Sequence, residues 1–266
     1  MRIGGLLVRV WVAACLLFLA SPIVVVIFSS FSASGYLRFP PQEFSLRWYA
    51  EFLSSEAWLK PLAVSFVLAL CVAVITTAIS GLAAVAIARR RFMGRGAFGF
   101  VVMAPLLFPH AAIGVALLGA LAIPGWVGTF QGIFLAHAIL CLPFAYRPLI
   151  NALRGFDPSM EEAAMSLGAS PSFVVRHVTL PILKPALVTS LIFTFIISFD
   201  EVTVTVFLIG PKAGTLPTQI FTTIQESASP VIAAVSSFLV MLTVGVVFLL
   251  DRLVGLQFFS ELERSR

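Results

Sequence analysis

The chain carries the stretch Glu162-Ala163-Ala164-Met165-Ser166-Leu167-Gly168 in a polar segment between two long hydrophobic ones, and Val178-Thr179-Leu180-Pro181 follows after nine further residues. Asp157, with a proline directly after it, is a typical helix N-cap. Gly168 permits the left-handed conformation that ends many helices. We therefore expect a short helix, a glycine turn and a second short helix that starts near Ser170. Such a segment suits insertion into a groove on another protein; an ordinary solvated loop is the alternative.

The composition places the chain in a membrane. Hydrophobic residues make up 60% of it, charged residues 11%, and the mean hydropathy is +1.06. A soluble domain cannot bury so much apolar surface, and a helical span needs about 20 apolar residues. The fold class is therefore all-α integral membrane, with six transmembrane helices. They are predicted near residues 10–31, 62–88, 99–122, 129–150, 185–209 and 231–253. Pro105 and Pro109 predict a bend in the third span.

The positive charges are unequally distributed between the segments that join the spans. With the N-terminus inside, 13 of the 17 lysines and arginines fall on the cytoplasmic side. This asymmetry follows the positive-inside rule, so both termini and the loop 151–184 are predicted to be cytoplasmic. We expect the cluster Arg89-Arg90-Arg91, with Arg95, to contact anionic membrane lipid. Direct contact with a partner subunit is the alternative. The net charge of +5 thus reflects topology, and no nucleic-acid partner is indicated.

The sequence carries no motif of enzyme or metal chemistry. The only lysines are Lys60, Lys184 and Lys212. None follows the glycine-rich frame of a phosphate-binding loop, so the chain is not predicted to be an ATPase. The three cysteines lie far apart within predicted spans, without metal-ligand spacing. We therefore predict no catalytic residue, no metal and no cofactor bound by this chain.

The polar stretch resembles the cytoplasmic loop of type I ABC importer permeases. The pattern there is Glu-Ala-Ala, three residues, Gly, nine residues, Ile, one residue and Leu-Pro, and only Val178 differs, in place of Ile. The resemblance implies that this loop is a coupling loop, which an ATPase moves. The implied coupling residues are Glu162, Ala163, Ala164, Gly168, Val178, Leu180 and Pro181.

The same resemblance implies the domain organisation and the partners. Residues 1–60 would form an N-terminal span and outer loop, 61–253 the permease core with its loop 151–184, and 254–266 a cytoplasmic tail. The implied partners are a second permease subunit in a heterodimer, two ATP-binding subunits that hold the ATP, and a periplasmic solute-binding protein. The implied location is the bacterial inner membrane.

Asp200 and Glu201 are acidic residues within the fifth predicted span. Asp200 is expected about 22 Å along that helix, in the outer half of the bilayer. A buried acid costs about 2.5–3.5 kcal/mol on insertion scales, so such residues mark solute paths. Because neighbouring residues point about 100° apart on a helix, only one is expected to line the path. A broken helix end, or a salt bridge to the partner permease, is the alternative. His110 and His137 are further candidates, although a lone intramembrane histidine commonly bonds a neighbouring helix.

The stretch Ser198-Phe199-Asp200-Glu201 is similar to that of spermidine/putrescine permeases, which implies a cationic polyamine as the solute. Related permeases for an opine, a phosphonate, thiosulfate or ferric ion are alternatives of the same class. A stand-alone channel or carrier, or a scaffolding membrane subunit, would be a different class. A carrier commonly shows inverted repeats with broken helices, and we find none in this sequence.

Overall fold

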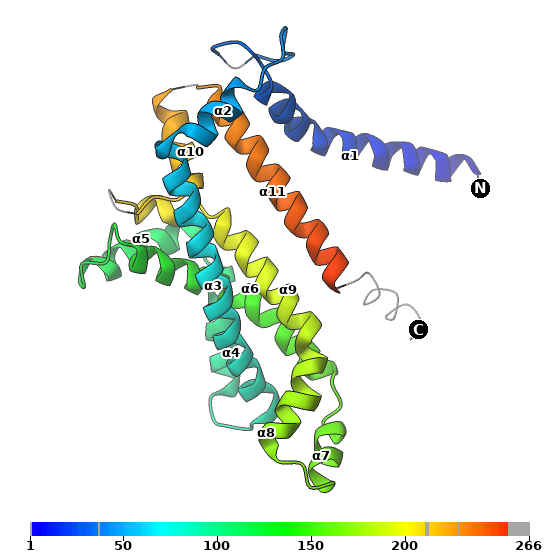
Figure 1. Cartoon of the computed structure of the whole chain (residues 1–266). Helices are drawn as coiled ribbons and strands as arrows, with labels where there is room; N and C mark the ends of the chain where they lie inside the picture. The colour runs from blue at the N-terminus through cyan, green and yellow to red at the C-terminus, as the bar shows by residue number, and fades with distance from the viewer. Residues whose placement is uncertain (1, 37, 211–212, 228, 255–266) are drawn as a thin grey trace. The chain divides into compact units, whose positions relative to one another are not determined.

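The computed structural model describes residues 2–36, 38–210, 213–227 and 229–254, and these are almost entirely helical (Figure 1). Two isolated antiparallel β-bridges pair Ser32 with Phe44 and Gly210 with Ala213. The α-helices are α1 (Arg2–Ser30), α2 (Arg47–Ser54), α3 (Glu56–Arg89), α4 (Arg95–Met103), α5 (His110–Ala122), α6 (Phe130–Gly155), α7 (Ser159–Ser166), α8 (Pro171–Val174), α9 (Leu180–Phe199), α10 (Leu216–Glu226) and α11 (Val231–Val254). Three short helices of other types are η1 (Ala104–Leu107), the π-helix η2 (Val175–Thr179) and η3 (Thr205–Phe207). Residues 255–266 of the predicted tail lie outside the described residues.

Five described helices are long and apolar enough to cross a membrane. The segments Arg95–Leu107 and His110–Ala122 add a sixth span if they are counted together, and a bend of 109° separates them. The break lies beside Pro105 and Pro109, where the sequence predicts a bend. The membrane-spanning helical character predicted from hydropathy is therefore present, with the third span broken into two arms.

The fifth span differs from its predicted bounds of 185–209. Its helical path starts at Pro171 and ends at Phe199, so it begins earlier and stops earlier than predicted. Proline is tolerated in the first turn of a helix, and a π-turn absorbs local misfit in the hydrogen-bond ladder. The π-helix η2 joins α8 to α9, so the helical path continues through Pro181. At the other end of α9, Asp200 takes the C-cap position. Asp200 and Glu201 consequently lie just after the span.

Contacts divide the chain into two compact units. The first unit contains Met1–Lys60 and Gln219–Gly245, and the second contains Pro61–Thr218 and Val246–Arg266. In the first unit, the indole N–H of Trp48 on α2 donates to the Ser32 carbonyl at 2.9 Å. Phe52 of the same helix packs against Phe238 of α11, with ring centroids 5.4 Å apart. The amphipathic helix α2 within the predicted outer loop was not expected from the sequence.

The second unit is built on the pairing of α6 with α9, which run side by side in Figure 1 with α7 and α8 at one end. α6 begins where the Thr129 hydroxyl accepts a hydrogen bond from the Gly132 N–H. Small polar side chains join the helices, because hydroxyls can bond backbone carbonyls across a tight interface. Ser190 of α9 donates to the Ala145 carbonyl at 2.8 Å, and Ser80 of α3 donates to the Leu142 carbonyl at 3.3 Å.

Two glycines meet where the turn between α5 and α6 crosses the segment after η3. The Gly128 N–H donates to the Leu208 carbonyl at 3.0 Å, and Gly128 has a φ of +75°. A Cβ added at Gly210 would lie 2.6 Å from the Gly128 Cα. The two backbones can therefore pack this closely only without side chains at these positions.

We predict that Gly210→Ala destabilises the permease core by about 1–3 kcal/mol, because overpacking forces backbone shifts. Gly214→Ala is the matched control, since nothing lies within 4 Å of its added Cβ. Thermal unfolding of the purified protein in detergent measures both. Equal unfolding midpoints for the two variants would show that the close approach does not constrain the fold.

Candidate functional site

The 151–184 loop begins with a capped helix. The backbone N–H of Ser159 donates to the Asp157 side chain at 2.9 Å. This hydrogen bond to the charged form holds the pKa of the Asp157 carboxyl below its ordinary value. Pro158 lies directly before α7 in helical conformation, and the Glu162 N–H donates to its carbonyl. The helix start predicted from these residues is thus confirmed, to within one or two residues.

Gly168 ends α7 and turns the chain into the next helix. Its φ is +90°, the left-handed region that favours glycine. The Ser170 hydroxyl then accepts a hydrogen bond from the Phe173 N–H and caps α8. The predicted helix–glycine–helix path is therefore present. The second helix is not a separate unit, because η2 continues it into α9.

The residues of the predicted coupling motif are presented on the outside of this loop. The side chain of Glu162 is exposed and has no ion pair or hydrogen bond with another described residue. Leu167 is 90% exposed, and Met165 and Phe173 are also exposed. Exposed apolar side chains grouped with a charged one are typical of a contact surface for another protein. The remaining motif residues are Ala163, Gly168, Leu180 and Pro181, which are exposed, and Ala164 and Val178, which are half-buried.

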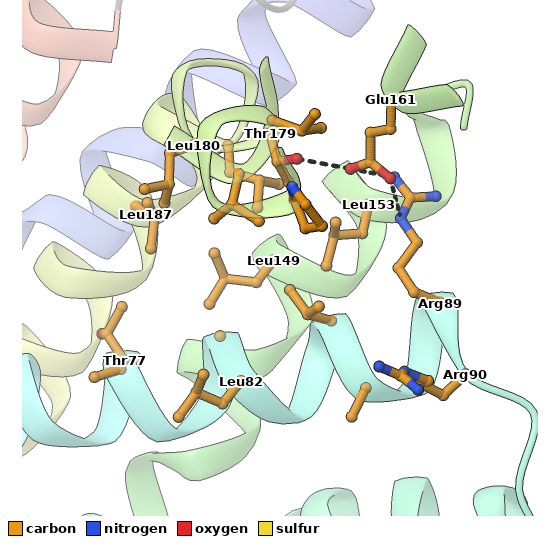
Figure 2. Close-up of a pocket in the computed structure, with 18 of the residues that line it drawn as sticks. Thr77, Leu82, Arg89, Arg90, Leu149, Leu153, Glu161, Thr179, Leu180 and Leu187 are labelled. Carbon is orange, nitrogen blue, oxygen red and sulfur yellow. Dashed lines mark hydrogen bonds and ion pairs between the residues drawn. The ribbon is translucent and has the colours of Figure 1, made fainter. Parts of the chain in front are cut away.

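Glu161, not Glu162, connects the loop to the helices. Arg89, the last residue of α3, places Nε 3.2 Å from Glu161 Oε2, and its Nη2 donates to Oε1 at 3.4 Å (Figure 2). The Thr179 hydroxyl of η2 donates to the same Oε1 at 2.7 Å. The side chains of the ion pair are only 20% and 17% exposed. The Arg89 guanidinium also lies 5.0 Å from the ring centre of Phe156, at the end of α6. This contact thus joins α3, α6, α7 and η2.

An apolar cavity of about 680 Å³ lies beside this contact (Figure 2). Thr77, Leu82 and neighbouring residues of α3 line one side, and Leu180 and Leu187 of α9 line another. Met165 of α7 also reaches it. The Arg89–Glu161 ion pair lies at the edge of this cavity. It is a direct polar connection between α3 and the loop, beside a space that the side chains of α3, α7 and α9 leave unfilled.

His110 and Glu201 come together at the far end of α9, and Asp200 does not join them. His110 Nδ1 lies 3.3 Å from Glu201 Oε2, and the Val204 N–H donates to Glu201 Oε1 at 2.8 Å. Glu201 is only 7% exposed. Asp200 is exposed, and its carboxylate forms no hydrogen bond or ion pair with another described residue. Of the two acids, Asp200 is therefore the exposed one and Glu201 the buried one.

His137 is a buried crosslink between α6 and α9. Its Nδ1 lies 2.9 Å from the Ser198 hydroxyl, and its Nε2 lies 2.7 Å from the Thr205 hydroxyl. The expectation that an intramembrane histidine bonds a neighbouring element is confirmed here. The sequence did not identify Ser198 and Thr205 as the partners of His137, because isolated hydroxyl residues in an apolar stretch form no distinguishing pattern.

Glu161, Arg89 and Thr179 were also missed as site residues. Glu161 is adjacent to Glu162 of the motif and has the same side chain. The two differ only in the face of α7 on which each one lies. Arg89 was assigned to a cationic cluster, and nothing in its sequence neighbourhood indicates a partner 72 residues away. In the described part of the chain, no group of three or more His, Cys, Asp or Glu side chains is placed to hold a metal ion.

Comparison with known proteins identifies the family. A protein-family model described as "Binding-protein-dependent transport system inner membrane component" matches residues 76–258. The chain belongs to this family. The match includes residues 76–89 of α3, all of α5 and α6, the 151–184 loop and α9, which carry the site residues described above.

Two sequence relatives and one solved structure extend over nearly the whole permease. The chain is 33% identical over 238 residues to the putrescine transport system permease protein PotI of Escherichia coli, covering 86% of this chain and 84% of the relative. It is 30% identical over 232 residues to the spermidine/putrescine transport system permease protein PotC of Haemophilus influenzae, covering 87% and 90%. The fold matches a bacterial ABC transporter involved in alginate import, with a TM-score of 0.73 at 19% identity over 94% of this chain and 96% of the other.

The permease is therefore the membrane subunit of an ABC importer, and its several apolar helices span the inner membrane. In such importers a separate subunit hydrolyses ATP. The predicted family and fold class are confirmed by these matches. The roles of individual residues in coupling and in solute passage stay predictions.

Proposed function

We propose that this permease imports a polyamine such as spermidine or putrescine, together with a second permease subunit, two ATP-binding subunits and a periplasmic solute-binding protein. The observation that carries the solute class is the free carboxylate of Asp200 at the end of α9. Both relatives described above are polyamine permeases by name, which supports the same class. ATP would be bound by the partner ATPases and not by this chain.

The 151–184 loop would be the part of the permease that the ATPase grips. The charge distribution supports a cytoplasmic position for this loop and for both termini, because most lysines and arginines fall on that side. Exposed Glu162 would pair with a cation of the ATPase, and Leu167 and Phe173 would pack into its surface groove. Movement of the loop would pass to α3 and α9 through Arg89, Glu161 and Thr179.

The glycine turn tests this role. A non-glycine residue in the left-handed region costs about 1–2 kcal/mol, and asparagine tolerates the region better than a β-branched residue. We predict that Gly168→Val leaves ATP hydrolysis running while solute uptake falls several-fold, and that Gly168→Asn retains uptake. Reconstituted transporter in proteoliposomes measures both rates.

The matched pair of variants separates backbone conformation from side-chain bulk, because nothing lies within 4 Å of a Cβ at this position. Both must be expressed at the wild-type level. Full coupling in Gly168→Val would show that the turn conformation is not needed for transmission.

The chemistry at the end of α9 favours a cationic solute. Glu201 already contacts His110 and accepts a hydrogen bond from the Val204 N–H, so both of its carboxylate oxygens have partners within the protein. The Asp200 carboxylate has no such partner among the described residues, and a polyamine ammonium would supply one. Glu201 would position the turn that carries Asp200, which explains why one of two adjacent acids is buried and the other open.

We predict that Asp200→Asn raises the KM for putrescine uptake about fivefold, because an ion pair of about 1 kcal/mol is lost. Glu226→Gln, which removes another exposed acid on α10, serves as the control and should leave the KM unchanged. Uptake of radiolabelled putrescine by cells that express the whole transporter is the measurement. An unchanged KM in Asp200→Asn, or uptake of an anionic solute such as a phosphonate in place of putrescine, would contradict the proposed solute.

A further inference from the structure

A second cavity, of about 500 Å³, lies where α6 ends and α4 begins. Arg147 and Arg154 line it together with Asn151, and their spacing of four and three residues places all three on one face of α6. Arg95, the first residue of α4, lines it from another helix. Three cationic side chains from separate turns thus face one space.

Nothing in the described protein neutralises these three charges. No acidic residue lines the cavity, and the three arginine side chains form no ion pair with another described residue. Tyr146 also lines it; this side chain is 5% exposed and its hydroxyl makes no hydrogen bond with another residue in the described ranges. Arginine forks match the oxygens of phosphate groups in a bidentate manner, so such a site suits a phosphate ester.

The surroundings of the cavity favour a lipid as the source of the phosphate. α4 exposes Phe98, Phe100 and Val101 within the same nine-residue helix that begins with Arg95. An acyl chain can lie along such apolar side chains while its headgroup enters the basic pocket. Basic pockets between membrane helices on the cytoplasmic side bind the headgroups of anionic lipids.

We propose that this cavity binds the phosphate group of an anionic phospholipid, held by Arg95, Arg147 and Arg154. The inference goes beyond the proposed transport function and depends on neither the solute nor the coupling role of the loop. It differs from general attraction of the Arg89–Arg91 cluster to the membrane, because it requires a saturable site with defined ligands.

The test uses the transporter purified with its partner subunits in detergent. Dioctanoyl phosphatidylglycerol is titrated, with dioctanoyl phosphatidylcholine as the zwitterionic probe of the same chain length and inorganic phosphate as the headgroup alone. We expect saturable binding of the anionic lipid, competition by millimolar phosphate, and weaker binding of the zwitterionic lipid. The double variant Arg147→Gln/Arg154→Gln should weaken binding about tenfold or more, because it removes two of the three cationic groups that would hold the phosphate.

Arg91→Gln is the matched control, because it removes one exposed positive charge near the start of α4 but outside the cavity lining. It should change the affinity less than twofold. Arg154→Lys keeps the charge but loses the fork, and it should show an intermediate affinity. Equal binding of the two lipids, an equal loss in Arg91→Gln, or a site that binds phosphate but does not bind the anionic lipid would each overturn the proposal. Binding to the isolated chain that disappears in the assembled transporter would also overturn it, because a protein partner would then cover the cavity.

Discussion

The ion pair between Arg89 and Glu161 is the constraint on which the arrangement of the loop depends. It closes the end of α3 onto α7, and the Thr179 hydroxyl adds η2 to the same carboxylate. Both charged side chains are largely shielded from water. Removing one partner of such a pair leaves the other charge uncompensated, and that loss exceeds the net value of the pair itself. The loop is therefore fastened to the bundle, while its motif face remains free for a partner.

Some buried polar side chains elsewhere in the helix bundle are also paired with other protein groups. With no water in a bilayer core, each polar group needs a partner within the protein. His137 meets this need with hydroxyls on both sides of the end of α9, and Glu201 meets it with His110 and a backbone N–H. These contacts fix the turn after Phe199. As a result, one carboxylate, that of Asp200, is left without a partner where the helix ends.

Hydropathy and local rules predicted the elements better than the connections between them. Long apolar runs located the spans, paired prolines located the break in the third one, and Gly168 and Ser170 located the turn and cap in the loop. Each of these features is determined by residues that are close together in the sequence. The early end of α9 was missed because residues 202–209, beyond the acidic pair, are again mainly apolar and were counted in the same span. In the structure the helix ends at Phe199, and Glu201 contacts His110 and the Val204 N–H.

The site residues show the same division. The exposed residues of the coupling motif, such as Glu162, Ala163 and Gly168, could be predicted because their pattern lies within one short stretch of the sequence. Glu161 could not be distinguished from Glu162, because both are acids in the first turn of one helix and only three-dimensional packing turns one toward Arg89. Long-range pairs of this kind carry no signal in a single sequence.

The central claim is that force on the loop reaches the membrane helices through the Arg89–Glu161 pair. A double-mutant cycle tests it most directly, with ATP hydrolysed per solute imported as the measured quantity in proteoliposomes. If the pair acts as one unit, Arg89→Ala and Glu161→Ala each raise this ratio, and the double variant is no worse than either single variant. Single variants with wild-type ratios, or effects that multiply in the double variant, would contradict the account.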